Sequence, residues 1–160
     1  MTPATAAPAV VIGPEPFGVF WADALPIITR HWREISAWPD IPLSVDVEKY
    51  LAVERDGKLR LVTAREDGVL VGYALFIVSP HGHYQGSLQA LQDVFYVDPS
   101  RRGYRLGLKL LKASEALLKA EGVQVVHHHV KCAHPALGRL LELRGYDWVE
   151  RIYSKRLDRG

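Results

Sequence analysis

Hydrophobic positions follow two alternating periods along this chain, one typical of strands and one typical of helices. Apolar runs bounded by turn residues predict strands, and apolar residues three or four positions apart predict amphipathic helices. The predicted strands cover residues 9–12, 59–64, 69–78, 88–97, 123–130 and one or two stretches within 148–157. The predicted helices begin near Asp23, at Ser44 or Asp46, at Tyr104 and at Pro135, and end before Pro39 and near Gly57, Gly122 and Gly145. This order predicts an α/β fold with a mixed central β-sheet flanked by about four helices.

Length and composition narrow the class of protein. The 160 residues, 48% of them hydrophobic, predict one domain over residues 9–160, preceded by a flexible tail over residues 1–8. The one cysteine, Cys132, rules out an internal disulfide framework and favours a cytoplasmic protein. A net charge of only +2 does not indicate nucleic acid as a partner. The longest apolar run, residues 69–78, is too short to span a membrane.

A basic turn with two glycines joins the strand over 88–97 to the helix after it. Its charged and flexible residues are Arg101, Arg102, Arg105, Gly103 and Gly107. The first N–H groups of a helix lack intrahelical partners and lie at the positive end of its dipole, so they bind anions. Glycine lets the backbone approach a phosphate closely. The pattern predicts a pyrophosphate site, with an ordinary strand-to-helix connection as the alternative.

The same turn is similar to the signature of the GNAT superfamily of acyl-CoA-dependent N-acetyltransferases, Arg/Gln-x-x-Gly-x-Gly/Ala. The window over 102–107 keeps the Arg-Gly opening and the closing Gly107, and it has Arg105 where the signature has its first glycine. Residues 66–74 resemble the hairpin and third strand of the family, and residues 134–146 resemble its fourth helix. The resemblance implies a GNAT-like fold, a soluble enzyme and acetyl-CoA as the donor cosubstrate.

The resemblance also implies which residues bind the donor. The pantetheine arm is expected to lie along the strand at Phe95, Tyr96 and Val97. The pyrophosphate is expected at Arg102, Gly103, Tyr104, Arg105, Leu106 and Gly107. His134 stands where the family commonly has an asparagine that touches the cofactor.

Transfer to an amine needs a base and an oxyanion donor. A free alkylamine with a pKa of about 10.4 is mostly protonated at neutral pH, and the tetrahedral intermediate carries an oxyanion. The resemblance places an acidic residue at Asp93 as the base and the Val97 N–H as the oxyanion donor. The alternative for Asp93 is a solvated or ion-paired strand residue. At the position of the usual general acid, a tyrosine, this chain has Leu141.

Other groups could serve as the acid or line the acceptor site. The candidates for the acid are Tyr84, Tyr96, His129 and His134, and the candidates for acceptor binding are Trp38 and Lys131. The run 127–129 is three histidines, which alternate between the two faces of a strand, so at most two can converge. These histidines either line the acceptor pocket beside Asp93 or are satisfied core and edge residues. We expect no metal site.

The sequence therefore predicts an N-acetyltransferase that moves an acetyl group from acetyl-CoA to a primary amine by direct transfer. A small amine, a peptide N-terminus and a lysine all remain possible acceptors. Two alternatives are an acyl-CoA-binding protein with little catalysis, motivated by Arg105 and Leu141, and a relative that modifies nucleic-acid bases. The predicted strands within 148–157 could pair two copies as a homodimer.

Overall fold

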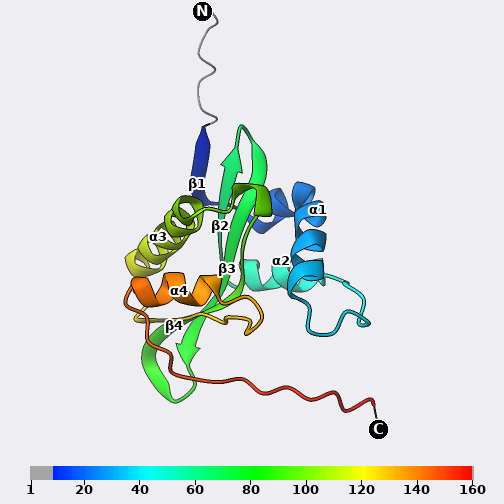
Figure 1. Cartoon of the computed structure of the whole chain (residues 1–160). Coiled ribbons are helices and arrows are strands. Elements are labelled where there is room, and N and C mark those ends of the chain that lie inside the picture. The colour runs from blue at the N-terminus through cyan, green and yellow to red at the C-terminus, as the bar shows by residue number, and fades with distance from the viewer. Residues whose placement is uncertain (1–8, 160) are drawn as a thin grey trace, which may run out of the picture. The chain divides into compact units, whose positions relative to one another are not determined.

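The computed structural model describes residues 9–159, except for the side chain of Tyr104. The tail expected over residues 1–8 lies outside the described residues. The chain divides into two compact units, one ending at His129 and the other beginning at Val130 (Figure 1). A single domain over residues 9–160 stays a prediction.

The first unit is built on a five-stranded mixed sheet, which confirms the predicted fold class. The strands are hydrogen-bonded in chain order, with antiparallel neighbours from β1 to β4 and a parallel pair between β4 and β5. Their bounds are β1 Val10–Pro14, β2 Leu59–Glu66, β3 Val69–His81, β4 Tyr84–Val97 and β5 Val125–His127. The turn between β2 and β3 has positive φ at Asp67 (48°) and Gly68 (83°), as expected for a two-residue hairpin.

Helices cover both faces of this sheet (Figure 1). α1 (Phe17–Ile35) and α2 (Val47–Arg55) pack on one face, where Phe20 and Tyr73 belong to a buried cluster. α3 (Tyr104–Ala120) packs on the other face, where Leu110 and Leu118 join Val62 in a second cluster. A short 3-10 turn, η1 (Pro99–Arg101), connects β4 to α3. The two helical layers are therefore separated by strands that are buried on both sides.

α1 begins at Phe17, six residues before Asp23, so the predicted start of this helix at Asp23 was wrong. Pro16 is its N-cap, and the first helical N–H, that of Phe17, donates to Glu54 Oε1 of α2 at 2.7 Å. The helix can start there because a neighbouring side chain supplies the missing cap. Asp23 instead lies within the helix and accepts from Arg65.

The second unit contains α4 (Ala136–Leu143), which ends as predicted at Gly145 with φ +84°. Residues 146–159 contain no strand, so the strands expected within 148–157 are not formed. Their large apolar side chains do not alternate, because neighbours such as Trp148 and Val149 are both apolar, and no one face would be buried by pairing. The sheet edge expected to join two copies is therefore not formed by these residues. In residues 9–159 no helix is long and apolar enough to cross a membrane.

Candidate active site

β4 carries an extra residue where it runs beside β3. Leu75 is opposite Val94 and Phe76 is opposite Gln92, so Asp93 has no partner in the register. Such a bulge turns consecutive side chains to the same face. Val94 packs against the α1 and α2 cluster, and Asp93 accepts a hydrogen bond from Tyr50 of α2 at 2.6 Å. The bulge therefore presents an exposed carboxyl group on the face covered by α1 and α2.

β4 and β5 separate immediately before the bulge. β5 is paired with β4 only at residues 89–91 and ends at His127, opposite Leu91. The Asp98 N–H donates to Val71 of β3 at 2.8 Å. Because alternate residues of an antiparallel strand point their backbone groups in opposite directions, Phe95 and Val97 point theirs away from β3. We call this side of β4, from residue 94 to 97, the open edge.

The side chains of Gln92 and His128 connect the strands where they part. His128 Nδ1 lies 2.5 Å from Gln92 Oε1, and Gln92 Nε2 donates to the His129 carbonyl at 3.4 Å. Burial, assisted by the neighbouring imidazoles, lowers the pKa of His128 to about 4. The His128 ring meets Phe76 and Phe95 edge-on, so it lies on the α3 face. His128 is therefore a neutral core imidazole on the face opposite Asp93.

The open edge leads into the basic turn, residues 97–107, and the first turn of α3. Gly103 is the N-cap, and a side chain on it would meet nothing within 4 Å. The side chain of Leu106 packs against the α3-face cluster, whereas Arg105 is exposed. The first N–H groups of α3 follow this turn in the chain, and N–H groups at a helix start lack intrahelical partners and can bind anions.

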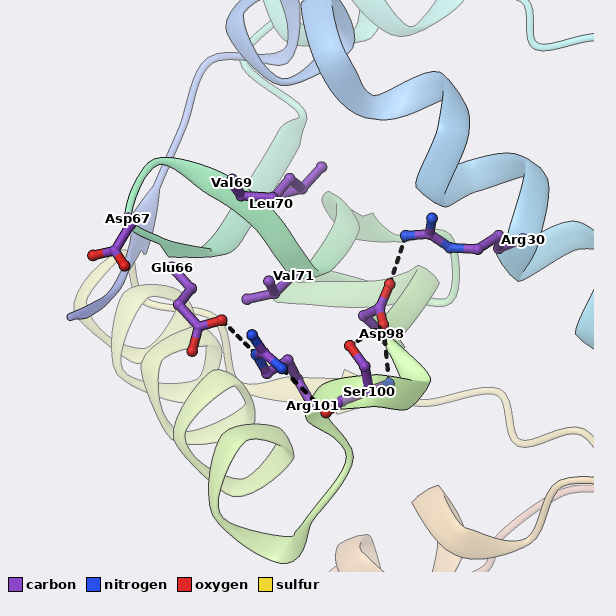
Figure 2. A pocket seen from close by; sticks show the side chains of 9 residues that line it. All are labelled: Arg30, Glu66, Asp67, Val69, Leu70, Val71, Asp98, Ser100 and Arg101. Atoms are coloured by element: carbon purple, nitrogen blue, oxygen red, sulfur yellow. Dashed lines mark hydrogen bonds and ion pairs between the residues drawn. The ribbon is translucent and has the colours of Figure 1, made fainter. Parts of the chain in front are cut away.

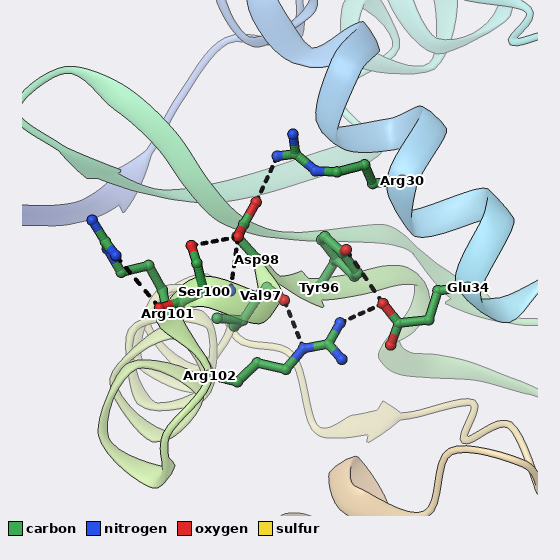
Figure 3. Close-up of polar contacts among 8 residues, drawn as sticks. All are labelled: Arg30, Glu34, Tyr96, Val97, Asp98, Ser100, Arg101 and Arg102. Atoms are coloured by element: carbon green, nitrogen blue, oxygen red, sulfur yellow. Dashed lines mark hydrogen bonds and ion pairs between the residues drawn. The ribbon is translucent and has the colours of Figure 1, made fainter.

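The three arginines of the basic turn have different environments, and Figure 3 shows two of them, Arg101 and Arg102. Arg101 pairs with Glu66, and Arg102 pairs with Glu34 of α1 at 2.6 Å. Arg102 also donates to the Val97 carbonyl at 3.0 Å and lies over the Tyr96 ring. Arg105 has no hydrogen bond or ion pair among the residues that the structure describes. Two of the three cations are therefore held by carboxylates of other elements, whereas Arg105 has no such partner among the described residues.

A third ion pair holds the start of the basic turn. Arg30 of α1 pairs with Asp98 at 2.5 Å, and Asp98 also accepts from the backbone and hydroxyl of Ser100. Burial alone would raise the pKa of Asp98, but these hydrogen bonds and Arg30 hold it below its usual range. Arg30 and Glu34 lie one helical turn apart on α1. Arg30 forms an ion pair with Asp98, and Glu34 forms one with Arg102.

A cavity of about 500 Å³ lies between α1, the β2–β3 turn and η1, and its lining includes Arg30, Asp98 and Ser100 (Figure 2). Its charged rim is formed by Arg30 with Asp98 and by Arg101 with Glu66, above the apolar Leu70 and Val71. The two ion pairs at this cavity join η1 and the residues next to it to α1 and β2, so they help to fix the start of the basic turn.

The structure brings some predicted site residues together and separates others. Asp93, Phe95, Tyr96, Val97 and the basic turn follow one another along β4. Tyr84 is at the opposite end of β4, about 30 Å along the strand from Asp93, where it stacks on His81.

The remaining predicted residues lie outside β4. Trp38 is in the loop between α1 and α2, and the exposed His129 follows β5. Lys131 and His134 belong to the second unit, so their roles stay predictions. The side chain of Tyr104 lies outside the described residues.

Tyr50, Glu34 and Gln92 were not predicted as site residues. The helical spacing of α2 marks Tyr50 only as a residue turned inward, and the contacts of all three come from elements distant in the sequence. Within residues 9–159, no group of three or more His, Cys, Asp or Glu side chains is arranged to hold a metal ion.

The comparisons with known proteins identify the family and agree with the fold. The family model described as "Acetyltransferase (GNAT) family" matches residues 21–146. This chain belongs to the GNAT family of acetyltransferases. None of the curated protein sequences matches it.

Solved structures share the fold at low sequence identity. A ribosomal-protein-alanine N-acetyltransferase from Brucella melitensis biovar Abortus 2308 is 17% identical with a TM-score of 0.71, covering 93% of this chain and 99% of its own. An aminoglycoside acetyltransferase from an uncultured soil metagenomic sample is 14% identical with a TM-score of 0.66, covering 92% and 96%. An acetyltransferase from Trypanosoma brucei is 18% identical with a TM-score of 0.64, covering 93% and 100%. At these identities the likeness shows the fold alone.

Proposed function

We propose that this protein transfers an acetyl group from acetyl-CoA to a primary amine by direct attack in a ternary complex. One observation carries the proposal: along the chain, the open edge of β4 lies between the start of α3 and an exposed carboxyl group on a bulge. The donor needs the open edge and the helix start, because pantetheine amides can pair with a free strand edge and the pyrophosphate can bind helix N–H groups. The acceptor amine needs the exposed carboxyl group on the bulge.

Each step of the transfer has a residue in this arrangement. The amine nitrogen attacks the thioester carbonyl carbon, and Asp93 takes a proton from the amine directly or through water. The Val97 N–H, which points away from β3, donates to the oxyanion of the tetrahedral intermediate. The C–S bond then breaks, and coenzyme A leaves as a thiolate. A thiol of pKa about 8.5 can leave without a general acid, which fits Leu141 at the usual tyrosine position.

The arginines divide two tasks in this proposal. Arg102 holds the Val97 carbonyl and Glu34, so it shapes the basic turn, whereas Arg105 binds a phosphate of the donor. In the family, the first signature glycine lets the backbone approach the phosphate closely. In this chain the charge of Arg105 would take over that role.

A protein that binds acyl-CoA without efficient catalysis is the second candidate. Leu141, which cannot donate a proton, favours it. The two functions differ in whether any amine triggers release of the coenzyme A thiol.

A thermal-shift titration with acetyl-CoA, followed by thiol release on a panel of primary amines, tests the proposal. We expect stabilisation by acetyl-CoA and release with at least one amine. Gly107→Glu places a carboxylate at the first turn of α3 and should abolish the shift. Gly82→Glu is the matched control, because a side chain there meets nothing within 4 Å in an exposed turn. A normal shift in Gly107→Glu would contradict the donor site, and stabilisation without release from any amine would favour the second candidate.

A further inference from the structure

The phenol of Tyr50 is the one described side chain that contacts the Asp93 carboxyl group. Tyr50 Oη donates to Asp93 Oδ2 at 2.6 Å, and within the described part of the chain no other group bonds to Asp93. Asp93 is the unpaired residue of the β4 bulge and its side chain is exposed. Without this contact, its carboxyl group would be free to rotate among several rotamers. Tyr50 therefore fixes the direction of the group that must face the amine.

Tyr50 itself is held firmly. Its ring stacks on Phe17 with 5.0 Å between centroids and 18° between planes, and Phe17 is only 2% exposed. The backbone N–H of Phe17 is bound by Glu54, one turn after Tyr50 on α2. The ring is therefore fixed by both α1 and its own helix, so that its hydroxyl is directed at β4.

The chemistry of the pair assigns one carboxyl oxygen to the protein and the other to the acceptor. Oδ2 accepts a hydrogen bond from the phenol. Oδ1 is therefore left to receive the proton of the amine. Burial raises the pKa of Tyr50, and the hydrogen bond to Asp93 and the charge of Asp93 raise it further. The phenol consequently keeps its own proton and acts as a donor, not as a base or a relay.

We propose that Tyr50 is a positioning residue for amine acetylation, which orients the Asp93 carboxyl group and reserves its Oδ1 for the acceptor amine. This inference rests on the proposed function, in which Asp93 is the base. It goes beyond that function by assigning a role to α2 in presenting the base.

A double-mutant cycle with Tyr50→Phe and Asp93→Asn tests this role. Tyr50→Phe removes the hydroxyl and keeps the ring on Phe17, so the loss should fall on the acceptor. We expect kcat/KM for the most active amine of the panel to fall about tenfold to a hundredfold in Tyr50→Phe, with an unchanged Kd for acetyl-CoA. In the Asp93→Asn background, Tyr50→Phe should have almost no further effect, because Tyr50 acts through Asp93.

Tyr73→Phe is the matched control. Tyr73 also makes a phenol hydrogen bond, 2.7 Å from His31 Nδ1, but on the buried side of α1 and away from Asp93. It should lower the melting temperature at least as much as Tyr50→Phe and leave the amine kinetics unchanged. Equal kinetic losses in the two variants would show that loss of stability, not positioning, explains the effect.

The outcomes separate the inference from the proposed function. Full activity of Tyr50→Phe with a strongly impaired Asp93→Asn would overturn the role of Tyr50 alone. Additive losses in the double variant would also overturn it. Unimpaired Asp93→Asn, or no release with any amine, would overturn the proposed base or the proposed reaction, and the role of Tyr50 with it.

Discussion

His128 shows how one side chain can connect two strands without taking part in the chemistry. It follows a histidine whose Nε2 lies 3.0 Å from Gln89 Oε1, yet the two imidazoles have different surroundings. His128 is bound to Gln92 and enclosed by aromatic edges at the point where β4 and β5 separate. An imidazolium would be poorly solvated there. The neutral ring therefore helps to determine where the sheet opens.

Stability should fall with decreasing pH because of His128. Its pKa is lowered from 6.5 to about 4 in the folded chain, so between these values the unfolded chain binds a proton that the folded chain does not. The free energy of unfolding is not reduced by His128 above pH 6.5. It decreases as the pH falls toward 4, by at most about 3 kcal/mol. Urea unfolding between pH 4 and 7 measures it. His128→Gln should flatten this slope, and His83→Gln, in an exposed turn, is the control.

Gly72 should not tolerate a side chain. A β-carbon on Gly72 would lie 3.1 Å from the Tyr96 carbonyl oxygen and 3.5 Å from Val97 Cγ2. Because the first of these is backbone of β4, Gly72→Ala should cost about 1 to 3 kcal/mol and shift the open edge, weakening acetyl-CoA binding. Gly13→Ala on β1, where nothing lies within 4 Å, should change stability by less than about 0.5 kcal/mol. Chemical denaturation and calorimetric titration would check both, and equal effects would contradict the packing argument.

At the scale of elements, the sequence predicts what depends on local pattern. The hairpin at Asp67 and Gly68 and the helix end at Gly145 follow from residues that tolerate positive φ, and both are present. The order of strands and helices as far as α4 and the α/β class follow from periodicity, whereas the strands expected within 148–157 are not formed. The true start of α1 does not, because Glu54, 37 residues away, supplies the N-terminal hydrogen bond.

The candidate site divides in the same way. The basic turn is contiguous and was predicted as a unit, with Arg101, Arg102 and Arg105 as its charged residues. The acids that hold two of these arginines, Glu66 and Glu34, come from β2 and α1. Their pairing depends on tertiary contacts that periodicity does not encode. Tyr50 was not predicted as a site residue for the same reason, because its contact with Asp93 is also a tertiary contact.

The cap of α2 is a choice that the sequence leaves open between Ser44 and Asp46. In the structure Asp46 is the N-cap and accepts from the Lys49 N–H at 3.0 Å, whereas Ser44 is exposed. Asp46→Ala should therefore cost about 1 kcal/mol, and Ser44→Ala should cost much less. Urea denaturation compares the two variants. Since α2 carries Tyr50, Asp46→Ala should also raise KM for the amine, and a larger loss in Ser44→Ala would contradict the assigned cap.

At the scale of the whole molecule, donor binding should complete the sheet of the first unit. β5 covers only residues 89–91 of β4, so the backbone groups of Phe95 and Val97 lack a strand partner on the open edge. A pantetheine arm lying there would act as the missing strand. Binding also stabilises every amide that exchanges only through global unfolding, by about 2.7 kcal/mol at a ligand concentration of 100 Kd.

Amide hydrogen exchange distinguishes these two effects. In the free protein, the Phe95 and Val97 amides should exchange faster than those of Val94 and Tyr96, which point toward β3. With acetyl-CoA, Phe95 and Val97 should gain far more protection than the common increase shared by core amides such as that of Leu110. The variant Gly107→Glu should show neither change. If all four β4 amides gain equal protection with acetyl-CoA, the donor does not pair with the open edge, because a uniform gain reports global stabilisation and not a new strand partner.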